Sequence, residues 1–107
     1  HYTYGGDVAK GIRVVMEHPA ALNEDFNISS AASTTVEELA AVIWRKLKGD
    51  APLRLVSDEP FEHDVQRRVP SVEKAKAMLG FEATTPLEVA LDEVIPWVAA
   101  QIEAGRI

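Results

Sequence analysis

The sequence has no cysteine and few cations, and both shortages narrow what the chain can do. Without cysteine it can form no disulfide, no thiolate nucleophile and no cysteine-ligated zinc site. Lys and Arg number 11 against 17 Asp and Glu, so the formal net charge is −6. An acidic chain is poorly suited to the phosphates of nucleic acid or to an anionic membrane surface. We therefore expect neither nucleic acid nor a membrane as a partner, and the apolar runs are too short to span a bilayer.

Motifs for nucleotide binding and for self-contained catalysis are also missing. The glycines form no G-x-G-x-x-G turn, and the segment 6–11 with Lys10 lacks the order of a phosphate-binding loop. The histidines at positions 1, 18 and 63 lie far apart, and none follows a nucleophile elbow. Residues 1–4 have neither the basic nor the apolar part of a signal peptide, which favours a cytoplasmic location. Because the sequence begins with His, we expect it to be a piece of a longer protein.

The residues that are present favour helices. The chain has 107 residues, is 47% hydrophobic, and its apolar side chains recur mainly with helical spacing. Four helices are predicted at about 8–17, 36–48, 72–79 and 86–104. The start signals are Asp7, Thr35 with Glu38, Ser71, and Thr85 followed by Pro86. The end signals are His18 before Pro19, Gly49 and Gly80, and Pro96 is expected to kink or split the last helix.

Short strands complete the predicted fold. The segments 2–4, 26–28 and 53–56 lie between the predicted helices and have strand-forming compositions. The prediction is therefore an α/β chain of four helices with two or three short strands.

The segment from Ser57 to Pro70 carries the most unusual chemistry. Its first part gathers several carboxylates and one imidazole, among them Glu59, Glu62, His63 and Asp64. A hard cation could use these groups, but a solvated acidic loop is the favoured interpretation.

Two adjacent arginines follow this acidic run. Arg67 and Arg68 precede the helix start expected at Ser71, where free backbone N–H groups and a guanidinium could hold a phosphate or a carboxylate. The alternative is that both arginines neutralise nearby carboxylates at the surface, and the local pattern alone favours this alternative.

Four stretches of the chain resemble one family. They are residues 4–12 (Tyr-Gly-Gly-Asp-Val-Ala-Lys-Gly-Ile), 26–29 (Phe-Asn-Ile-Ser), 35–40 (Thr-Val-Glu-Glu-Leu-Ala) and 68–88, in which Arg68, Pro70, Lys74-Ala75, Leu79-Gly80 and Leu87-Glu88 match a recurring signature. In this order and spacing they are similar to the C-terminal third of the extended short-chain dehydrogenases, the NAD-dependent epimerases and dehydratases of nucleotide sugars. The resemblance runs from Tyr2 to Trp97.

The resemblance implies that the chain contributes to two lobes of a larger protein. Residues 1–33 would be the last helix and strand of the Rossmann lobe, and residues 34–107 the C-terminal substrate-binding lobe. Arg68 matches an arginine that reaches the nucleotide-sugar site in the branch that decarboxylates UDP-sugar acids, and Arg67 and Asp64 share its loop. Phe61 stands where the epimerase branch has a diphosphate-binding arginine.

The resemblance also implies that the cofactor-binding and catalytic residues of the family lie outside this chain. The family's NAD-binding glycines and catalytic Tyr-x-x-x-Lys precede the matched segment, so this chain would bind no NAD and hold no catalytic residue. The parent protein would be an NAD-dependent epimerase, dehydratase or decarboxylase, with a UDP-sugar as the favoured ligand and a homodimer as a possible assembly. The alternative from another class is a stand-alone α/β protein-interaction module without enzyme activity.

Overall fold

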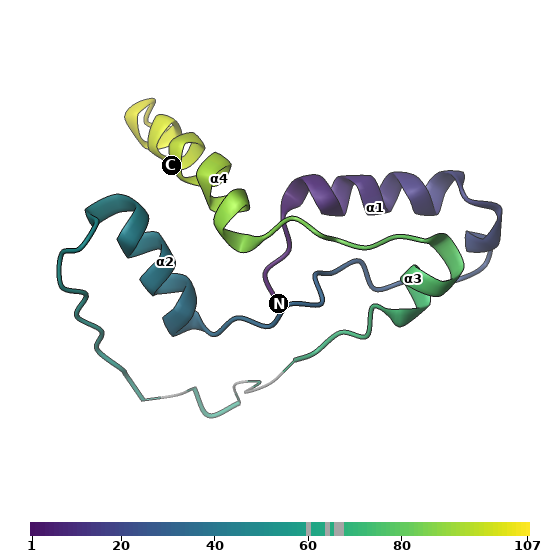
Figure 1. Cartoon of the computed structure of the whole chain (residues 1–107), viewed down its shortest axis with the longest axis horizontal. Helices are drawn as coiled ribbons and strands as arrows, with labels where there is room; N and C mark the ends of the chain where they lie inside the picture. The colour runs from purple at the N-terminus through teal and green to yellow at the C-terminus, as the bar shows by residue number, and fades with distance from the viewer. Residues whose placement is uncertain (60, 64, 66–67) are drawn as a thin grey trace.

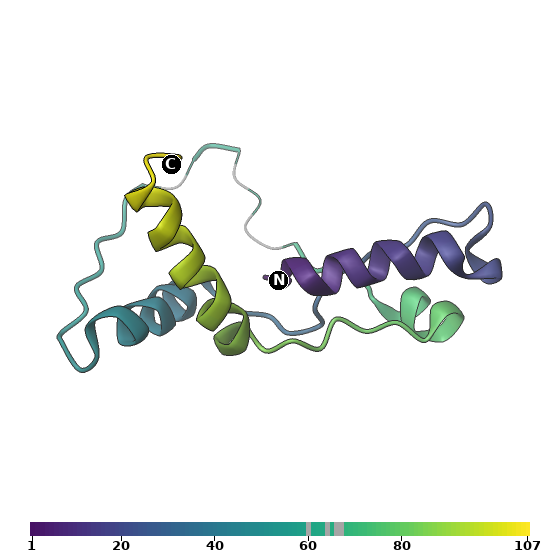
Figure 2. The ribbon, with the colours of Figure 1, turned by 90° about the horizontal axis from the view of Figure 1, so that it is seen from above.

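Helices dominate the fold. The computed structural model describes residues 1–59, 61–63, 65 and 68–107, and within these it contains four α-helices and one short 3₁₀ helix. They are α1 (Gly5–Glu17), η1 (Pro19–Ala21), α2 (Val36–Lys48), α3 (Glu73–Leu79) and α4 (Leu87–Glu103). Helices α1 and α3 lie at one end of the molecule and α2 and α4 at the other (Figures 1 and 2). A long irregular segment joins α2 to α3 along one side (Figure 1).

The first end of the molecule is built around small residues. Helices α1 and α3 both contact η1, and the buried apolar side chains here are Ala21, Ala75 and Leu79. Gly11 of α1 is buried because Ile28 and Phe81 lie directly against its backbone. A Cβ atom on residue 11 would stand 2.5 Å from Cγ2 of Ile28 and 3.0 Å from Cζ of Phe81. The glycine thus allows the helix, the segment after η1 and the segment after α3 to approach one another closely.

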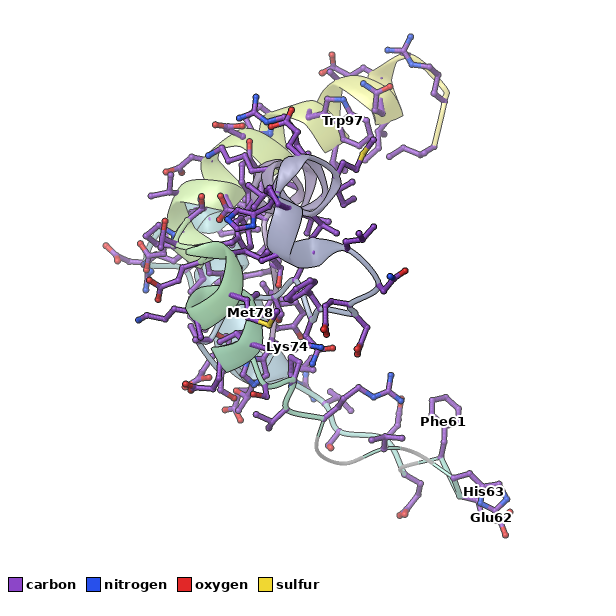
Figure 3. All side chains as sticks on the ribbon, turned by 90° about the vertical axis from the view of Figure 1, so that its right-hand side faces the viewer. Phe61, Glu62, His63, Lys74, Met78 and Trp97 are labelled. Carbon is purple, nitrogen blue, oxygen red and sulfur yellow. The ribbon has the colours of Figure 1, made fainter. Side chains whose placement is uncertain are left out.

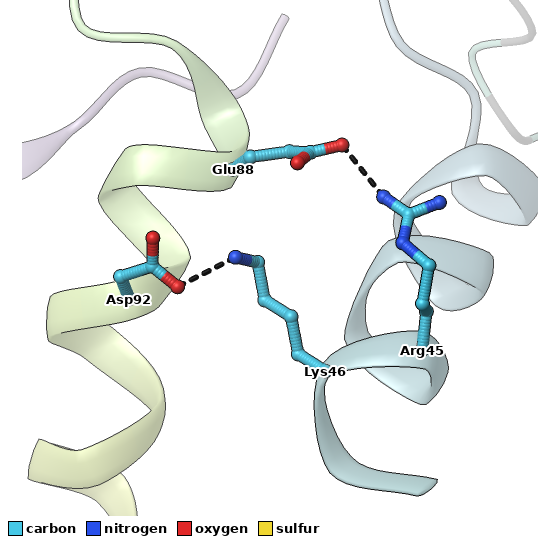
Figure 4. A network of polar contacts seen from close by, with 4 residues as sticks. All are labelled: Arg45, Lys46, Glu88 and Asp92. Carbon is cyan, nitrogen blue, oxygen red and sulfur yellow. Dashed lines mark hydrogen bonds and ion pairs between the residues drawn. The ribbon is translucent and has the colours of Figure 1, made fainter. Parts of the chain in front are cut away.

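At the other end of the molecule, ion pairs and a small apolar contact join α2 to α4. Arg45 Nη2 of α2 lies 2.6 Å from Glu88 Oε1 of α4, and Lys46 Nζ lies 2.5 Å from Asp92 Oδ1 (Figure 4). Beside these ion pairs, Ala90 and Leu91 of α4 are buried. Where the N-terminal segment meets the two helices, a cavity of about 250 Å³ remains between Tyr4, Leu39 and Val94.

A buried carboxylate joins the two ends. Asp7 is only 3% exposed, and its Oδ2 accepts a hydrogen bond of 2.8 Å from the backbone N–H of Thr85, 78 residues away. Lys10 Nζ lies 3.6 Å from the other carboxylate oxygen. The hydrogen bond from Thr85, helped by the positive charge of Lys10, holds the pKa of Asp7 below its ordinary value. The start of α1 is therefore fixed to the segment that leads into α4.

Several predicted helix limits are confirmed and others are wrong. Helix α2 has the predicted capping box: Thr35 Oγ1 accepts from the Glu38 N–H at 3.1 Å, and Glu38 Oε2 accepts from the Thr35 N–H at 2.7 Å. Gly80 ends α3 in the left-handed region, as predicted. Asp7 does not cap α1, because the helix already begins at Gly5 and the carboxylate bonds to Thr85 instead. Helix α4 continues through Pro96 without a break.

The predicted strands are not formed, which corrects the α/β fold class. The segments 2–4, 26–28 and 53–56 lie outside the helices, and within the described residues none of them pairs with another segment in a ladder of backbone hydrogen bonds. An isolated bridge joins Ser30 to Ala83. A strand exists only when a neighbouring strand takes up its backbone hydrogen bonds. The composition of these segments favours an extended backbone, whereas pairing into a strand also requires a neighbouring segment, which a local pattern does not specify.

The chain buries little of its surface. Its accessible surface is 8486 Å², whereas a compact folded monomer of this mass exposes about 5900 Å². Its radius of gyration is 17.1 Å, against about 13 Å for a compact domain of this length. Large side chains such as Met16 (81% exposed), Leu22 (79%) and Trp97 (61%) face solvent. Among the described residues, no helix is both long and apolar enough to cross a membrane.

Replacing Gly11 by Ala should destabilise the fold. The new Cβ would overlap Ile28 and press on Phe81, so that these side chains or the helix would have to shift, and we expect a loss of about 1–3 kcal/mol in the free energy of unfolding. Urea unfolding followed by far-UV circular dichroism measures it. Gly5→Ala is the matched control, since nothing lies within 4 Å of a Cβ at that position, and equal stability of both variants would contradict the packing role of Gly11.

The Asp7 contact should make stability depend on acid pH. Because the pKa of Asp7 is lower in the folded chain than in the unfolded chain, its contribution is complete above the unfolded value and is lost as pH falls through the folded value. We expect the urea midpoint of the native chain to fall below about pH 4, and Asp7→Asn to reduce this pH dependence. Asp50→Asn removes the same charge at an exposed position and should leave the pH dependence as it is; the same flattening in both variants would rule out a special role for Asp7.

Candidate functional site

The predicted binding loop lies in the irregular segment between α2 and α3. Arg68 is exposed, while Asp64 and Arg67 lie outside the described residues. Phe61, which is 86% exposed, stands with Glu62 and His63 at the far end of the loop, pointing away from the helices (Figure 3). The structure therefore does not bring the acidic part of the loop onto the helices.

The cation site considered for this loop finds no support in the part of the chain that the structure describes. Within those residues no three His, Asp or Glu side chains gather closely enough to hold a metal ion. Glu62 and His63 face solvent, and Asp64 lies outside the described residues.

The helix start expected beside Arg68 lies further along the chain. Helix α3 begins at Glu73, one residue after the predicted start, and Val72 stands at the cap position predicted for Ser71, with no side-chain cap. Glu73 places a carboxylate in the first turn of α3, where the helix dipole would otherwise favour an anionic ligand. The guanidinium of Arg68 is exposed, and within the described residues no carboxylate lies within 4.0 Å of it.

The end of the loop is attached to the segment that follows η1. Asn27 Nδ2 donates a hydrogen bond of 3.0 Å to the backbone oxygen of Ser71, 44 residues away. Lys74, one turn further on, places its Nζ 2.9 Å from Glu24 Oε2 and 3.1 Å from Asp25 Oδ1. The same ammonium lies 5.2 Å from the centre of the Phe26 ring. Residues 24–27 and residues 71–74 are therefore joined by hydrogen bonds, charge and an aromatic contact.

The charges at this attachment shift two pKa values in opposite directions. Hydrogen bonding to Glu24 and Asp25 raises the pKa of Lys74, and the same contact with Lys74 lowers the pKa of Asp25. Both groups stay charged over a wide range of pH, so the attachment is not a pH switch near neutrality. Figure 3 shows Lys74 on the body of the molecule, well away from the loop tip with Phe61.

A second hollow was not expected from the sequence. A cavity of about 410 Å³ opens between the segments 29–34 and 82–87, and six of the residues that line it carry hydroxyl groups. They belong to Tyr2, Ser29, Ser30, Thr34, Thr84 and Thr85. Small polar residues in loops are ordinary turn-formers, so their convergence on one hollow has no signal in the sequence.

Comparison with known proteins shows which enzymes this chain is related to. UDP-glucuronic acid decarboxylase 1 of Danio rerio is 26% identical over 102 residues, which is 95% of this chain and 23% of that protein. The corresponding protein of Xenopus tropicalis is 24% identical over the same length, and UDP-glucuronic acid decarboxylase 6 of Arabidopsis thaliana is 29% identical over 90 residues. The chain is a distant homologue of the UDP-glucuronic acid decarboxylases, which are extended short-chain dehydrogenases.

This relationship confirms the family resemblance of the four sequence stretches. The chain spans about a quarter of the length of the curated decarboxylases that it matches. No protein-family model and no solved structure matches it.

The structure gives physical roles to several residues of the family signature. Lys74 holds residues 24–26, Ala75 and Leu79 are buried, and Gly80 takes the left-handed conformation that ends α3. Phe81 then returns to Gly11 of α1. This part of the signature builds the support from which the loop with Arg68 extends.

Proposed function

We propose that this chain is the C-terminal nucleotide-sugar-binding part of an NAD-dependent enzyme that acts on a UDP-sugar. The observation that carries the proposal is the relationship to UDP-glucuronic acid decarboxylases along 95% of the chain. Decarboxylation of a UDP-sugar acid is the favoured reaction of the parent, ahead of epimerisation or dehydration. The chain by itself would not be catalytic.

The contribution of this chain to such a reaction is recognition. Arg68 carries a planar guanidinium, which can donate two parallel hydrogen bonds to the oxygens of a phosphate. Its exposed position at the end of the loop leaves it accessible to a ligand. Arg67 and Asp64 of the same loop remain candidate contributors by their match to the family. A diphosphate is the group on a UDP-sugar that best fits this chemistry.

The cofactor would be held elsewhere. The sequence contains no glycine-rich dinucleotide turn and no Tyr-x-x-x-Lys pair, so these residues do not fit NAD. NAD would supply the reversible oxidation of the sugar, and the family pattern puts its binding site in an N-terminal Rossmann lobe. Residues 1–33 would complete that lobe, with residues 34–107 forming the substrate-binding lobe.

The large exposed apolar surface supports this arrangement. Side chains such as Met16, Leu22 and Trp97 cost free energy when they face water. Within the described residues the segments 2–4 and 26–28 belong to no helix or sheet, and a neighbouring strand could pair with segments of this kind. A Rossmann lobe packed against them would satisfy both.

Removing the Arg68 side chain tests the proposal. In the longer protein that contains this chain and the N-terminal lobe, Arg68→Ala should weaken the binding of UDP by about 10- to 100-fold, because a charged hydrogen-bonding pair is lost. Isothermal titration calorimetry with UDP measures the affinity, and release of CO₂ from UDP-glucuronic acid in the presence of NAD measures the activity.

Arg54→Ala is the matched control, since Arg54 is an exposed arginine in the same irregular segment. It should leave UDP affinity unchanged. Unchanged affinity in Arg68→Ala would remove Arg68 from the site. Absence of both UDP binding and turnover in the native protein, with UDP-, dTDP- and GDP-sugars all tried, would overturn the proposed function.

A further inference from the structure

The backbone just after Arg68 is held at one point. The carbonyl of Ser71 accepts the hydrogen bond from Asn27 Nδ2 at 3.0 Å. Ser71 is three residues beyond Arg68, and three residues of chain reach at most about 10 Å. The anchored carbonyl therefore limits where the backbone of Arg68 can lie.

The short connection between Arg68 and Ser71 is stiff. Pro70 fixes its own φ near −65°, and Val69, as the residue before a proline, is restricted to extended conformations. Few backbone angles remain free between the anchored carbonyl and the arginine. A displacement of Ser71 is thus passed on to Arg68 instead of being absorbed by the chain between them.

The support behind the anchor is itself fixed. Lys74 is held by Glu24 and Asp25, which are close neighbours of Asn27 along the chain. Ala75 is 2% exposed, so the first turn of α3 cannot shift without opening buried packing. Asn27 consequently connects the end of the loop to a segment that is itself joined to α3 by ion pairs.

We propose that Asn27 is a positioning residue for Arg68. By holding the carbonyl of Ser71, its amide sets the place from which the guanidinium reaches the diphosphate of a UDP-sugar. The inference rests on the proposed function, because it assigns to Asn27 an effect that passes through Arg68. Asn27 itself touches no ligand.

A double-mutant cycle in the longer protein tests this inference. UDP affinity is measured by calorimetry for the native protein, Asn27→Ala, Arg68→Ala and the double variant. Asn27→Ala should weaken UDP binding by about 3- to 10-fold, the effect of one lost hydrogen bond. If Asn27 acts through Arg68, the double variant should bind no more weakly than Arg68→Ala alone, within about twofold. With UDP-glucuronic acid as substrate, Asn27→Ala should raise KM and leave kcat close to the native value.

Two further variants separate positioning from general loss of structure. Asn27→Asp keeps the shape of the side chain and loses the amide donor, so it should weaken UDP binding as Asn27→Ala does. Lys76→Ala removes the other ion pair of α3, with Glu82, which lies 3.0 Å away, and should leave UDP affinity unchanged. Asn27 is exposed, so its replacement should shift the urea midpoint only slightly.

Each result bears on one of the two proposals. Native affinity in Asn27→Ala and Asn27→Asp, with weakened affinity in Arg68→Ala, would overturn the positioning role and leave the proposed function standing. A double variant weaker than Arg68→Ala by the full Asn27→Ala factor would also overturn it, because Asn27 would then act independently of Arg68. Native affinity in Arg68→Ala would remove Arg68 from the site and would overturn the positioning role with it, whereas the proposed function itself falls only if the native protein neither binds UDP nor turns over the sugar nucleotides.

Discussion

The arrangement of the two ends of the molecule depends on the buried carboxylate of Asp7. It accepts the N–H of Thr85 just before α4 begins, and Tyr4, which lies at the start of α1, donates its hydroxyl to Glu93 of α4. An unpaired carboxylate at 3% exposure would be strongly unfavourable, so this contact must form whenever α1 and the 84–87 segment come together. A family motif residue thereby serves to orient helices that are far apart in the sequence.

This contact explains how a chain with a small core keeps a defined shape. The buried apolar side chains in the described part of the chain are small or few, and polar contacts between distant segments do much of the positioning: Asp7 with Thr85, Asn27 with Ser71, and Lys74 with Glu24 and Asp25. Polar contacts of this kind fix direction and register more than they add stability.

Local signals in the sequence predicted the helices well and the long-range contacts poorly. The capping box of Thr35 and Glu38 and the left-handed Gly80 depend on residues within one turn, so the sequence alone was enough to place them. Asp7 could not be placed in the same way, because the choice between capping its own helix and bonding to Thr85 is decided 78 residues away. The predicted strands failed for a related reason, since extended segments become strands only through a partner that no local pattern specifies.

In the candidate site, too, the local sequence pattern identified a residue but not its long-range contacts. Arg68 can be singled out from the sequence because its residue type and its place before Val69-Pro70 match a family signature, whereas the hydrogen bond from Asn27 to Ser71, 44 residues away, has no signal in the sequence. Net charge alone would have excluded a phosphorylated ligand from a chain at −6. Yet many of the cations here are already matched by nearby carboxylates, such as Lys10 by Asp7, Arg45 by Glu88 and Lys74 by Asp25. An acidic net charge is therefore compatible with recognition of an anion by a single guanidinium, provided that the backbone that carries this group is fixed. In our proposal the restricted backbone of Val69 and Pro70, together with the hydrogen bond from Asn27 to Ser71, would supply that condition for Arg68.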